Sequence, residues 1–282
     1  MNDHDFLVQA PGIAPELVAH LGRRANASAI VPSGMGAPVA YRFPEIEPDP
    51  GLADVARAAG CDAAFVPRSR RFAHVRVVAL DMDSTLITIE CVDEIADLQG
   101  IKPEIARITA SAMRGEIEFA DSLRQRVALL AGMPVSALLR VYDERLQISE
   151  GAQRMVKAFQ AAGARIALVS GGFTFFTERL QQRLGLDYAI ANTLDIADGK
   201  LTGRIAGAVV DAQVKADTVR RLKREFAGNG GLTVTIGDGA NDLPMFAEAD
   251  VSIAYRAQPV VRAQATHTLD VCGLDGVLNL FA

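Results

Sequence analysis

Short apolar runs and amphipathic stretches alternate along the first 70 residues. Apolar or alternating runs predict strands, and an apolar period near 3.6 predicts helices. On this basis we expect strands at 6–10, 28–34, 38–43 and 62–67 and helices at 15–25 and 49–60. The order βαββαβ is typical of a ferredoxin-like (α+β) domain. We assign that domain to residues 1–70, because a basic, turn-prone stretch follows at 67–74.

Three longer apolar runs, rich in β-branched residues, follow at 75–83, 164–172 and 232–242. Continuous runs of this kind are typical of parallel strands that helices cover on both faces. Helical patterns precede the second and third runs. Residues 72–282 are therefore expected to form an α/β domain with a doubly wound parallel sheet.

The segment between the first two runs is much longer than a crossover requires. Residues 86–150 show helical periodicity and no strand pattern, whereas about a dozen residues suffice to connect parallel strands. We therefore expect an inserted helical cap at about 86–150. A second departure, at 188–210, has the pattern of a β-excursion that turns at the sequence DGK.

Composition and charge exclude several classes of protein. Half of the 282 residues are hydrophobic and 22% are charged, which excludes a disordered or fibrous chain. The net charge of −5 gives no broad attraction to nucleic acid or to anionic membranes. No run approaches the roughly 18 apolar residues of a membrane span, and the acidic N-terminus has no signal-peptide pattern. Three scattered cysteines (Cys61, Cys91 and Cys272) are expected to be buried thiols in a reducing compartment, so we expect a cytoplasmic protein.

Small polar and acidic residues follow each of the three long apolar runs. They are Asp81, Asp83, Ser84 and Thr85 after the first, Ser170, Gly171 and Gly172 after the second, and Asp238, Asn241 and Asp242 after the third. Because ligands of open α/β sheets bind at the carboxyl ends of parallel strands, we expect these side chains to lie together. Carboxylates gathered there repel one another unless a cation neutralises them. An all-oxygen donor set without cysteine or histidine favours Mg²⁺ over zinc.

Asp81 and Asp83 are separated by one residue. On a regular strand, positions i and i+2 point to the same face, so both carboxyl groups are expected to reach one bound group. One of them can attack as a nucleophile while the other carries a proton to the leaving group. The alternative is that the sequence DMDST only caps a following helix; the acidic and glycine-rich ends of the other two strands favour the functional interpretation.

Two further features predict an anion site. Ser170 and Gly171 offer a hydroxyl and an unobstructed backbone amide just before a helix. Lys215 lies in the first turn of a helix that begins near Asp211, where its charge adds to the positive helix end. Taken alone, the glycines are typical of a tight turn and the lysine of a solvated surface residue.

The set DMDST, VSGG, Lys215 and GDGANDLPM resembles, in order and spacing, the haloacid dehalogenase-like phosphatase superfamily over about residues 72–282. The resemblance extends into the cap, where Glu90 and the segment FADSLRQRV (119–127), with Phe119 and Arg126, are similar to the phosphoserine phosphatase family. Met82 departs from the family pattern, which often has phenylalanine or another apolar residue at this position.

The resemblance implies a reaction and a metal. Asp81 resembles the nucleophile that forms an aspartyl-phosphate, and Asp83 resembles the general acid that protonates the leaving oxygen and then activates water. Mg²⁺ would be bound by Asp81, Asp238 and the backbone carbonyl of Asp83.

The same resemblance assigns the phosphate-binding groups. Ser170, Gly171 and Lys215 would hold the phosphoryl oxygens. Asn241 would contact the substrate or its metal-bound water, and Asp242 would support Lys215 or the metal shell.

The cap residues are expected to select the substrate. Glu90 and Arg126 have the charges that complement the ammonium and carboxylate groups of a phosphorylated amino acid. Phe119 lies seven residues before Arg126 and so shares its helix face, and Met113 together with Phe119 would form an apolar lid. Without the resemblance, solvated surface charges would be the simpler interpretation.

We therefore expect Mg²⁺-dependent hydrolysis of O-phospho-L-serine, the last step of serine biosynthesis, with neither nucleic acid nor membrane as partner. One alternative is a related phosphatase or phosphotransferase for another small phosphomonoester. Another is an amino-acid-sensing regulatory protein, because the βαββαβ order of residues 1–70 resembles the ACT-type regulatory fold. A homodimer formed through this ACT-like domain is also expected.

Overall fold

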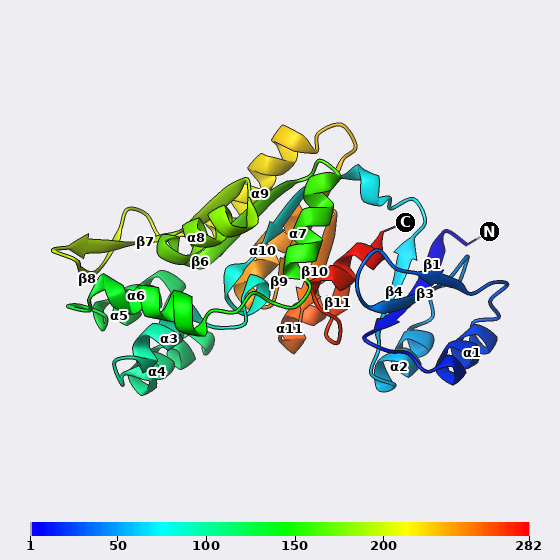
Figure 1. The fold of residues 1–282 in the computed structure, drawn as a ribbon, viewed down its shortest axis with the longest axis horizontal. Coiled ribbons are helices and arrows are strands. Elements are labelled where there is room, and N and C mark those ends of the chain that lie inside the picture. The colour runs from blue at the N-terminus through cyan, green and yellow to red at the C-terminus, as the bar shows by residue number, and fades with distance from the viewer. Residues whose placement is uncertain (1, 282) are drawn as a thin grey trace.

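The structure, a computed structural model, describes residues 2–281. An N-terminal unit with its own sheet lies at one end of the molecule, a helical cap lies at the other, and a parallel sheet lies between them (Figure 1). None of the helices in the described part of the chain combines the length and apolar character needed to cross a membrane.

The N-terminal unit has the expected βαββαβ order. Its elements are β1 (His4–Ala10), α1 (Pro15–Arg24), β2 (Val31–Ser33), β3 (Val39–Phe43), α2 (Pro50–Ala58) and β4 (Asp62–Pro67). The four strands form an antiparallel sheet in the order β2-β3-β1-β4, which confirms the ferredoxin-like prediction. Proline starts both helices, where its missing N–H costs nothing, and the Asp49 carboxylate caps α2 by accepting from the Gly51 amide.

Both faces of this antiparallel sheet are covered. Phe6 and Val8 on one face of β1 pack with the core residues of α1 and α2. Leu7 and Ala64, on the opposite face, belong to the hydrophobic core of the larger unit. Alternation along each strand therefore supplies two buried faces rather than one buried and one solvated face.

A C-terminal segment, Leu274–Leu280 (η5), lies between the two units, as Figure 1 shows in red. Gln9 donates to the carbonyl of Gly276 at 3.1 Å, and Arg42 donates to the carbonyls of Asn279 and Phe281, both at 2.8 Å. Nearby, the buried Asp62 carboxylate accepts from three consecutive backbone amides, those of residues 270–272, at 2.7–3.1 Å. These hydrogen bonds fasten the N-terminal sheet to the rest of the chain.

The larger sheet has seven strands in the order β11-β10-β9-β5-β6-β7-β8. They are β5 (Val75–Leu80), β6 (Arg165–Phe173), β7 (Tyr188–Ala197), β8 (Lys200–Ala206), β9 (Leu232–Gly237), β10 (Val251–Tyr255) and β11 (His267–Leu269). All neighbouring strands are parallel except β7 and β8, which form the expected β-excursion. The sequence had indicated only β5, β6 and β9 as parallel strands, so β10, β11 and the start of β7 enlarge the predicted sheet.

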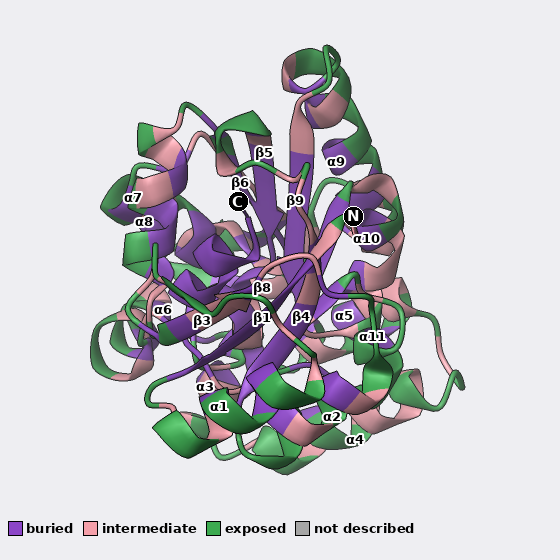
Figure 2. Ribbon diagram, turned by 90° about the vertical axis from the view of Figure 1, so that its right-hand side faces the viewer, coloured by how far each residue is buried: buried purple, intermediate pink, exposed green. Residues whose placement is uncertain are grey.

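Helices cover both faces of this sheet. They are α7 (Ala152–Ala161), α8 (Thr174–Leu184), α9 (Ala212–Phe226), α10 (Leu243–Glu248) and α11 (Pro259–Arg262). Val78 and Leu80 contribute to the core on one face, whereas Val77 and Ala79 contribute to a second core on the other. Figure 2 shows β5 and β9 buried along most of their length and exposure concentrated on the helices. The doubly wound prediction is confirmed.

The inserted cap is helical, as predicted. It contains α3 (Cys91–Asp97), α4 (Lys102–Met113), α5 (Phe119–Ala128), α6 (Val135–Arg140) and a final turn at Val141–Arg145 (η3). The chain enters and leaves it side by side, because Ile87 bridges to Ile148 and the Ser149 amide donates to the carbonyl of Leu86 at 2.9 Å. The β7–β8 hairpin supports the cap from outside, where the Leu201 amide donates to the carbonyl of Met133 at 2.8 Å.

Candidate active site

The carboxyl ends of β5, β6 and β9 open into a cavity of about 700 Å³ that the cap covers. Nine of the predicted site residues line it: Asp81, Asp83, Glu90, Phe119, Arg126, Ser170, Gly171, Asp238 and Asn241. Lys215 and Asp242 are buried next to them, 1% and 0% exposed, and make ion pairs with the lining residues or with each other. The structure thus brings all eleven predicted residues together.

The geometry predicted for Asp81 and Asp83 is wrong in one respect. The strand β5 ends at Leu80, and a turn at Met82–Leu86 (η2) follows in which Ser84 has a positive φ of 55°. Asp83 therefore lies in the turn and not at position i+2 of a regular strand. Asp81 stays extended, with its carboxylate accepting from the Met82 amide at 2.7 Å, and the turn still places both carboxyl groups against the cavity.

Asp83 is held in surroundings that favour its protonated form. Burial raises the pKa of its carboxyl group well above the ordinary value, and the negative charges of Glu90 and Asp81 raise it further. The Cys91 amide donates to this carboxyl at 3.1 Å and only partly offsets the effect. A raised pKa favours the protonated form of the carboxyl group, which is the form that can give a proton to a leaving group.

Lys215 lies between two carboxylates. Its ammonium group is 2.7 Å from an oxygen of Asp81 and 2.8 Å from an oxygen of Asp242. Burial alone lowers the pKa of Lys215, but the charges of Asp242 and Asp81 outweigh burial and the pKa is raised overall. The second oxygen of Asp242 accepts from the amides of Asp238 and Gly239, both at 3.1 Å. Lys215 is therefore a fixed positive charge at the end of β5.

Three carboxylates form a compact acidic cluster. Oxygens of Asp81, Asp238 and Asp242 lie within 4.8 Å of one another. Burial, together with the charges of Asp81 and Asp242, raises the pKa of Asp238 to about 7, although Thr85 donates to it at 2.9 Å. Oxygen donors that repel one another in this way fit a hard divalent cation. The side chain of Asp83 is not in this cluster, whose third carboxylate is Asp242.

The carboxyl end of β6 lines the same cavity. Ser170 is 1% exposed, and its hydroxyl accepts from the Gly172 amide at 2.9 Å. A side chain at Gly171 would place its Cβ 3.1 Å from the ring of Phe119, so the cap approaches closely here. The side-chain amide of Asn241 donates to Asp81 at 3.5 Å. Asp81 therefore lies in a polar cavity, with Phe119 of the cap packed close to Gly171.

Charged groups of the cap line the far side of the cavity. Burial raises the pKa of Glu90, and the negative charges of Asp81 and Asp93 raise it further. The Ser84 hydroxyl donates to Glu90 at 2.6 Å and partly offsets this rise. Burial lowers the pKa of the Arg126 guanidinium, and the charge of Asp93 counteracts it. The predicted lid residue Met113 lines the cavity, yet it is 70% exposed.

The lining residues that the sequence analysis did not single out include Asp93 and Ser122. Asp93 lies one helical turn after Glu90, and Ser122 lies one turn before Arg126. The spacings i+3 and i+4 place each on the same helix face as its neighbour. Helical periodicity around the two predicted residues was the signal that would have found them.

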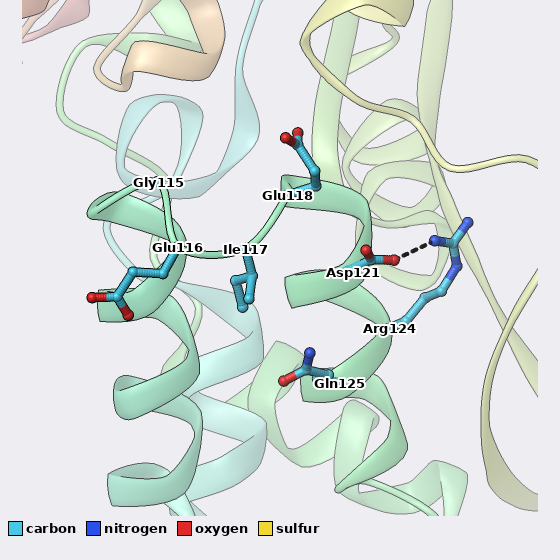
Figure 3. A pocket seen from close by; sticks show the side chains of 7 residues that line it. All are labelled: Gly115, Glu116, Ile117, Glu118, Asp121, Arg124 and Gln125. Carbon is cyan, nitrogen blue, oxygen red and sulfur yellow. Dashed lines mark hydrogen bonds and ion pairs between the residues drawn. The ribbon is translucent and has the colours of Figure 1, made fainter.

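A second cavity, of about 440 Å³, lies on the cap between the end of α4 and the start of α5 (Figure 3). Asp121 and Arg124 pair with each other at 3.0 Å, whereas Glu116 and Glu118 point away from that pair. This cavity contains none of the predicted site residues.

Comparisons with known proteins identify the family of this chain. A profile described as haloacid dehalogenase-like hydrolase matches residues 78–247. A phosphoserine phosphatase from Polaromonas sp. is 50% identical over 214 residues, which cover 73% of this chain and 89% of that protein.

Solved structures of similar proteins give the same result. A crystal structure of a probable phosphoserine phosphatase from Vibrio cholerae, in unliganded form, has a TM-score of 0.85 at 36% identity, covering 98% of this chain and 85% of the other. A substrate-bound phosphoserine phosphatase complex has a TM-score of 0.67 at 35% identity, covering 74% of this chain and 99% of the other. The chain therefore belongs to the haloacid dehalogenase-like hydrolases and, within them, to the phosphoserine phosphatase family.

Proposed function

We propose that this protein hydrolyses O-phospho-L-serine to L-serine and phosphate, the closing step of serine biosynthesis, through an aspartyl-phosphate on Asp81. The observation that carries the proposal is the buried Lys215 between Asp81 and Asp242, opposite a cap that contributes Glu90 and Arg126 to the same cavity. One end of that cavity suits a phosphate and the other suits an amino acid.

In the first step an oxygen of Asp81 attacks phosphorus while Asp83 gives its proton to the departing serine oxygen. The raised pKa of Asp83 supports this assignment, because it favours the protonated carboxyl group that a general acid requires. In the second step Asp83, now ionised, removes a proton from the water that attacks the aspartyl-phosphate. Lys215, the Ser170 hydroxyl and the Gly171 amide stabilise the charge on the phosphoryl oxygens.

The acidic cluster supports a requirement for Mg²⁺. The carboxylates of Asp81 and Asp238 and the backbone carbonyl of Asp83 would hold the ion, and Asp242 would support both Lys215 and this set. When bound, Mg²⁺ offsets the repulsion between the Asp81 carboxylate and the phosphate dianion. Asn241, next to Asp81, would contact the substrate or its metal-bound water.

The cap would recognise the amino-acid end of the substrate. Arg126 can hold a carboxylate through two hydrogen bonds, and Glu90 can accept from an ammonium group. Phe119, packed against Gly171, would close the site over the phosphate. The three buried cysteines, Cys61, Cys91 and Cys272, are unpaired, which supports a reducing, cytoplasmic location.

Phosphate release from phosphoserine, with and without Mg²⁺, tests the proposal. Activity should vanish with a chelator and return with Mg²⁺. Phosphoserine should be preferred over phosphoethanolamine and sugar phosphates, whereas equal rates on all of them would favour the alternative of a general phosphatase for small phosphomonoesters.

Two arginines of α5, Arg126 and Arg124, allow a matched test of substrate recognition by the cap. Arg126→Ala should reduce the preference for phosphoserine, because the substrate carboxylate loses its partner. Arg124→Ala, which removes an exposed arginine two residues away on the same helix, should leave the preference unchanged. Equal effects of the two substitutions would contradict the role of Arg126.

The ACT-like role of the N-terminal unit stays a prediction, as does a homodimer formed through it. Calorimetric titration of the whole chain with serine measures the first, and sedimentation of the whole chain measures the second. The absence of heat and a purely monomeric mass would remove both ideas without affecting the phosphatase proposal.

A further inference from the structure

Ser122 on α5 lines the active-site cavity and is completely buried, with 0% exposure. Its hydroxyl oxygen has no hydrogen-bond partner anywhere in residues 2–281. A buried hydroxyl without a partner costs roughly 1–3 kcal/mol, and most such groups in folded proteins are paired. The position of this one, at the wall of a binding cavity, calls for an explanation.

The ordinary local partner is not used. A serine or threonine inside a helix can donate to the carbonyl four residues earlier. Thr109 on α4 and Thr218 on α9 do so, at 3.1 and 2.8 Å. For Ser122 the carbonyl four residues earlier is that of Glu118, which accepts from the Ser122 amide at 2.9 Å but not from its hydroxyl.

The neighbours of Ser122 show what kind of ligand group would reach it. Phe119, Ser122 and Arg126 are spaced i, i+3 and i+7 and form one stripe of α5 along the cavity. The Phe119 ring lies against Gly171, beside the proposed phosphate site, and the Nε of Arg126 donates to the Ser122 carbonyl at 3.4 Å. Ser122 thus lies between the phosphate end of the cavity and the guanidinium group.

We infer that the Ser122 hydroxyl is a specificity-determining group that donates a hydrogen bond to the substrate carboxylate beside Arg126. This inference rests on the proposed function. The acidic groups of the cap wall, Glu90 and Asp93, are suited to an ammonium ion, and the hydroxyl of Thr109, which also lines the cavity, already donates to the carbonyl of Ile105. A hydroxyl donor next to a guanidinium instead completes a site for a carboxylate, since both supply N–H or O–H groups to its oxygens.

The inference predicts an unusual combination of effects for Ser122→Ala. Without substrate, the variant should be at least as stable as the parent protein, because a buried hydroxyl that has no partner is removed. With phosphoserine, kcat/KM should fall by roughly ten- to a hundredfold, the worth of a hydrogen bond to a charged group. Thr177→Val is the matched control, because Thr177 also has a buried, unpartnered hydroxyl but does not line the cavity.

Three substrates locate the interaction. Phosphoserine has both charged groups, phosphoethanolamine lacks the carboxylate, and 3-phosphooxypropanoate lacks the ammonium group. Ser122→Ala should reduce kcat/KM for phosphoserine and 3-phosphooxypropanoate and leave that for phosphoethanolamine unchanged. A loss confined to substrates with an ammonium group, an equal loss on all three, or no loss on any would overturn the inference.

The same data separate this inference from the proposed function. If the parent protein does not prefer phosphoserine over phosphoethanolamine, the proposed substrate is wrong. If it does prefer phosphoserine, and Ser122→Ala keeps that preference in full, only the role of Ser122 is wrong. A lowered unfolding temperature for Ser122→Ala, with Thr177→Val unaffected, would indicate a structural hydroxyl and also overturn the inference.

Discussion

Replacement of Lys215 by methionine tests the central electrostatic feature of the site. The Lys215 ammonium lies 2.7 Å from Asp81 and 2.8 Å from Asp242, and all three side chains are buried. Methionine keeps most of the volume but leaves two buried carboxylates without their cation. Removing one partner of a buried ion pair typically lowers the free energy of unfolding by roughly 3–5 kcal/mol.

Protonation limits the part of that loss that Asp242 causes and makes it depend on pH. In the metal-free variant Asp242 can take up a proton, which at pH 7.5 costs about 5 kcal/mol for a carboxyl of ordinary pKa 3.8. The cost falls by about 1.4 kcal/mol for each unit that the pH is lowered, so at pH 5.5 it is about 2 kcal/mol. The deficit of the variant should therefore grow as the pH rises, as expected for a carboxyl whose pKa is raised by folding.

Urea unfolding of the metal-free protein and of the metal-free variant at pH 5.5 and 7.5 measures the loss in free energy of unfolding at each pH. Lys223→Met is the control, because Lys223 lies on the same helix and pairs with Asp250 at 2.6 Å at a partly exposed site, where the expected loss is about 0–1 kcal/mol. Lys215→Met should also lose phosphate release yet bind Mg²⁺ more tightly, because the acidic cluster becomes more negative. Equal losses for the two variants, or a deficit independent of pH, would refute the reasoning.

Three other measurements test separate parts of the structure. Asp81→Asn should reduce phosphate release by about a thousandfold or more and abolish acid-labile phosphate on the protein, whereas residual incorporation would assign the nucleophile elsewhere. Because the pKa of Asp238 is raised to about 7 in the folded state, metal-free stability should decrease as the pH rises from about 4 to about 7; the gain in Tm from Mg²⁺ should then increase over that window, and a constant gain would contradict the cluster. Burial, together with the charge of Arg70, lowers the pKa of His267 from 6.5 to about 3, so the unfolded chain protonates first and stability should decrease as the pH falls below about 6.5. His267→Gln should flatten that decrease in urea unfolding, and an unchanged pH dependence would show that other groups cause it.

The parts of the site that lie at strand ends were predictable from the sequence. Parallel strands present their carboxyl ends at one edge of a sheet, so Asp81, Ser170 and Asp238 could be brought together without any knowledge of the fold beyond strand order. The turn after β5 was not predictable in the same way. A left-handed residue is usually glycine, whereas here it is Ser84, which gives no sign in the sequence that the strand ends three residues before the end of the apolar run 75–83.

Features that depend on contacts between distant segments were missed for another reason. The apolar alternation of β1 predicts a strand but does not say that both of its faces are covered. The second face of β1 is covered by η5, which follows β1 by more than 260 residues. Likewise, the stripe of Phe119, Ser122 and Arg126 on α5 can be given a role only when the cavity beside it is known.

The C-terminal segment has a consequence for how the molecule melts. Because η5 contributes to the core of the larger unit and also receives hydrogen bonds from Gln9 and Arg42, neither unit keeps its own packing once the other opens. Calorimetry should accordingly give one heat-absorption peak for the full chain rather than two. A shortened chain that begins after β4 would expose the backbone amides of residues 270–272, now bound by Asp62, to solvent.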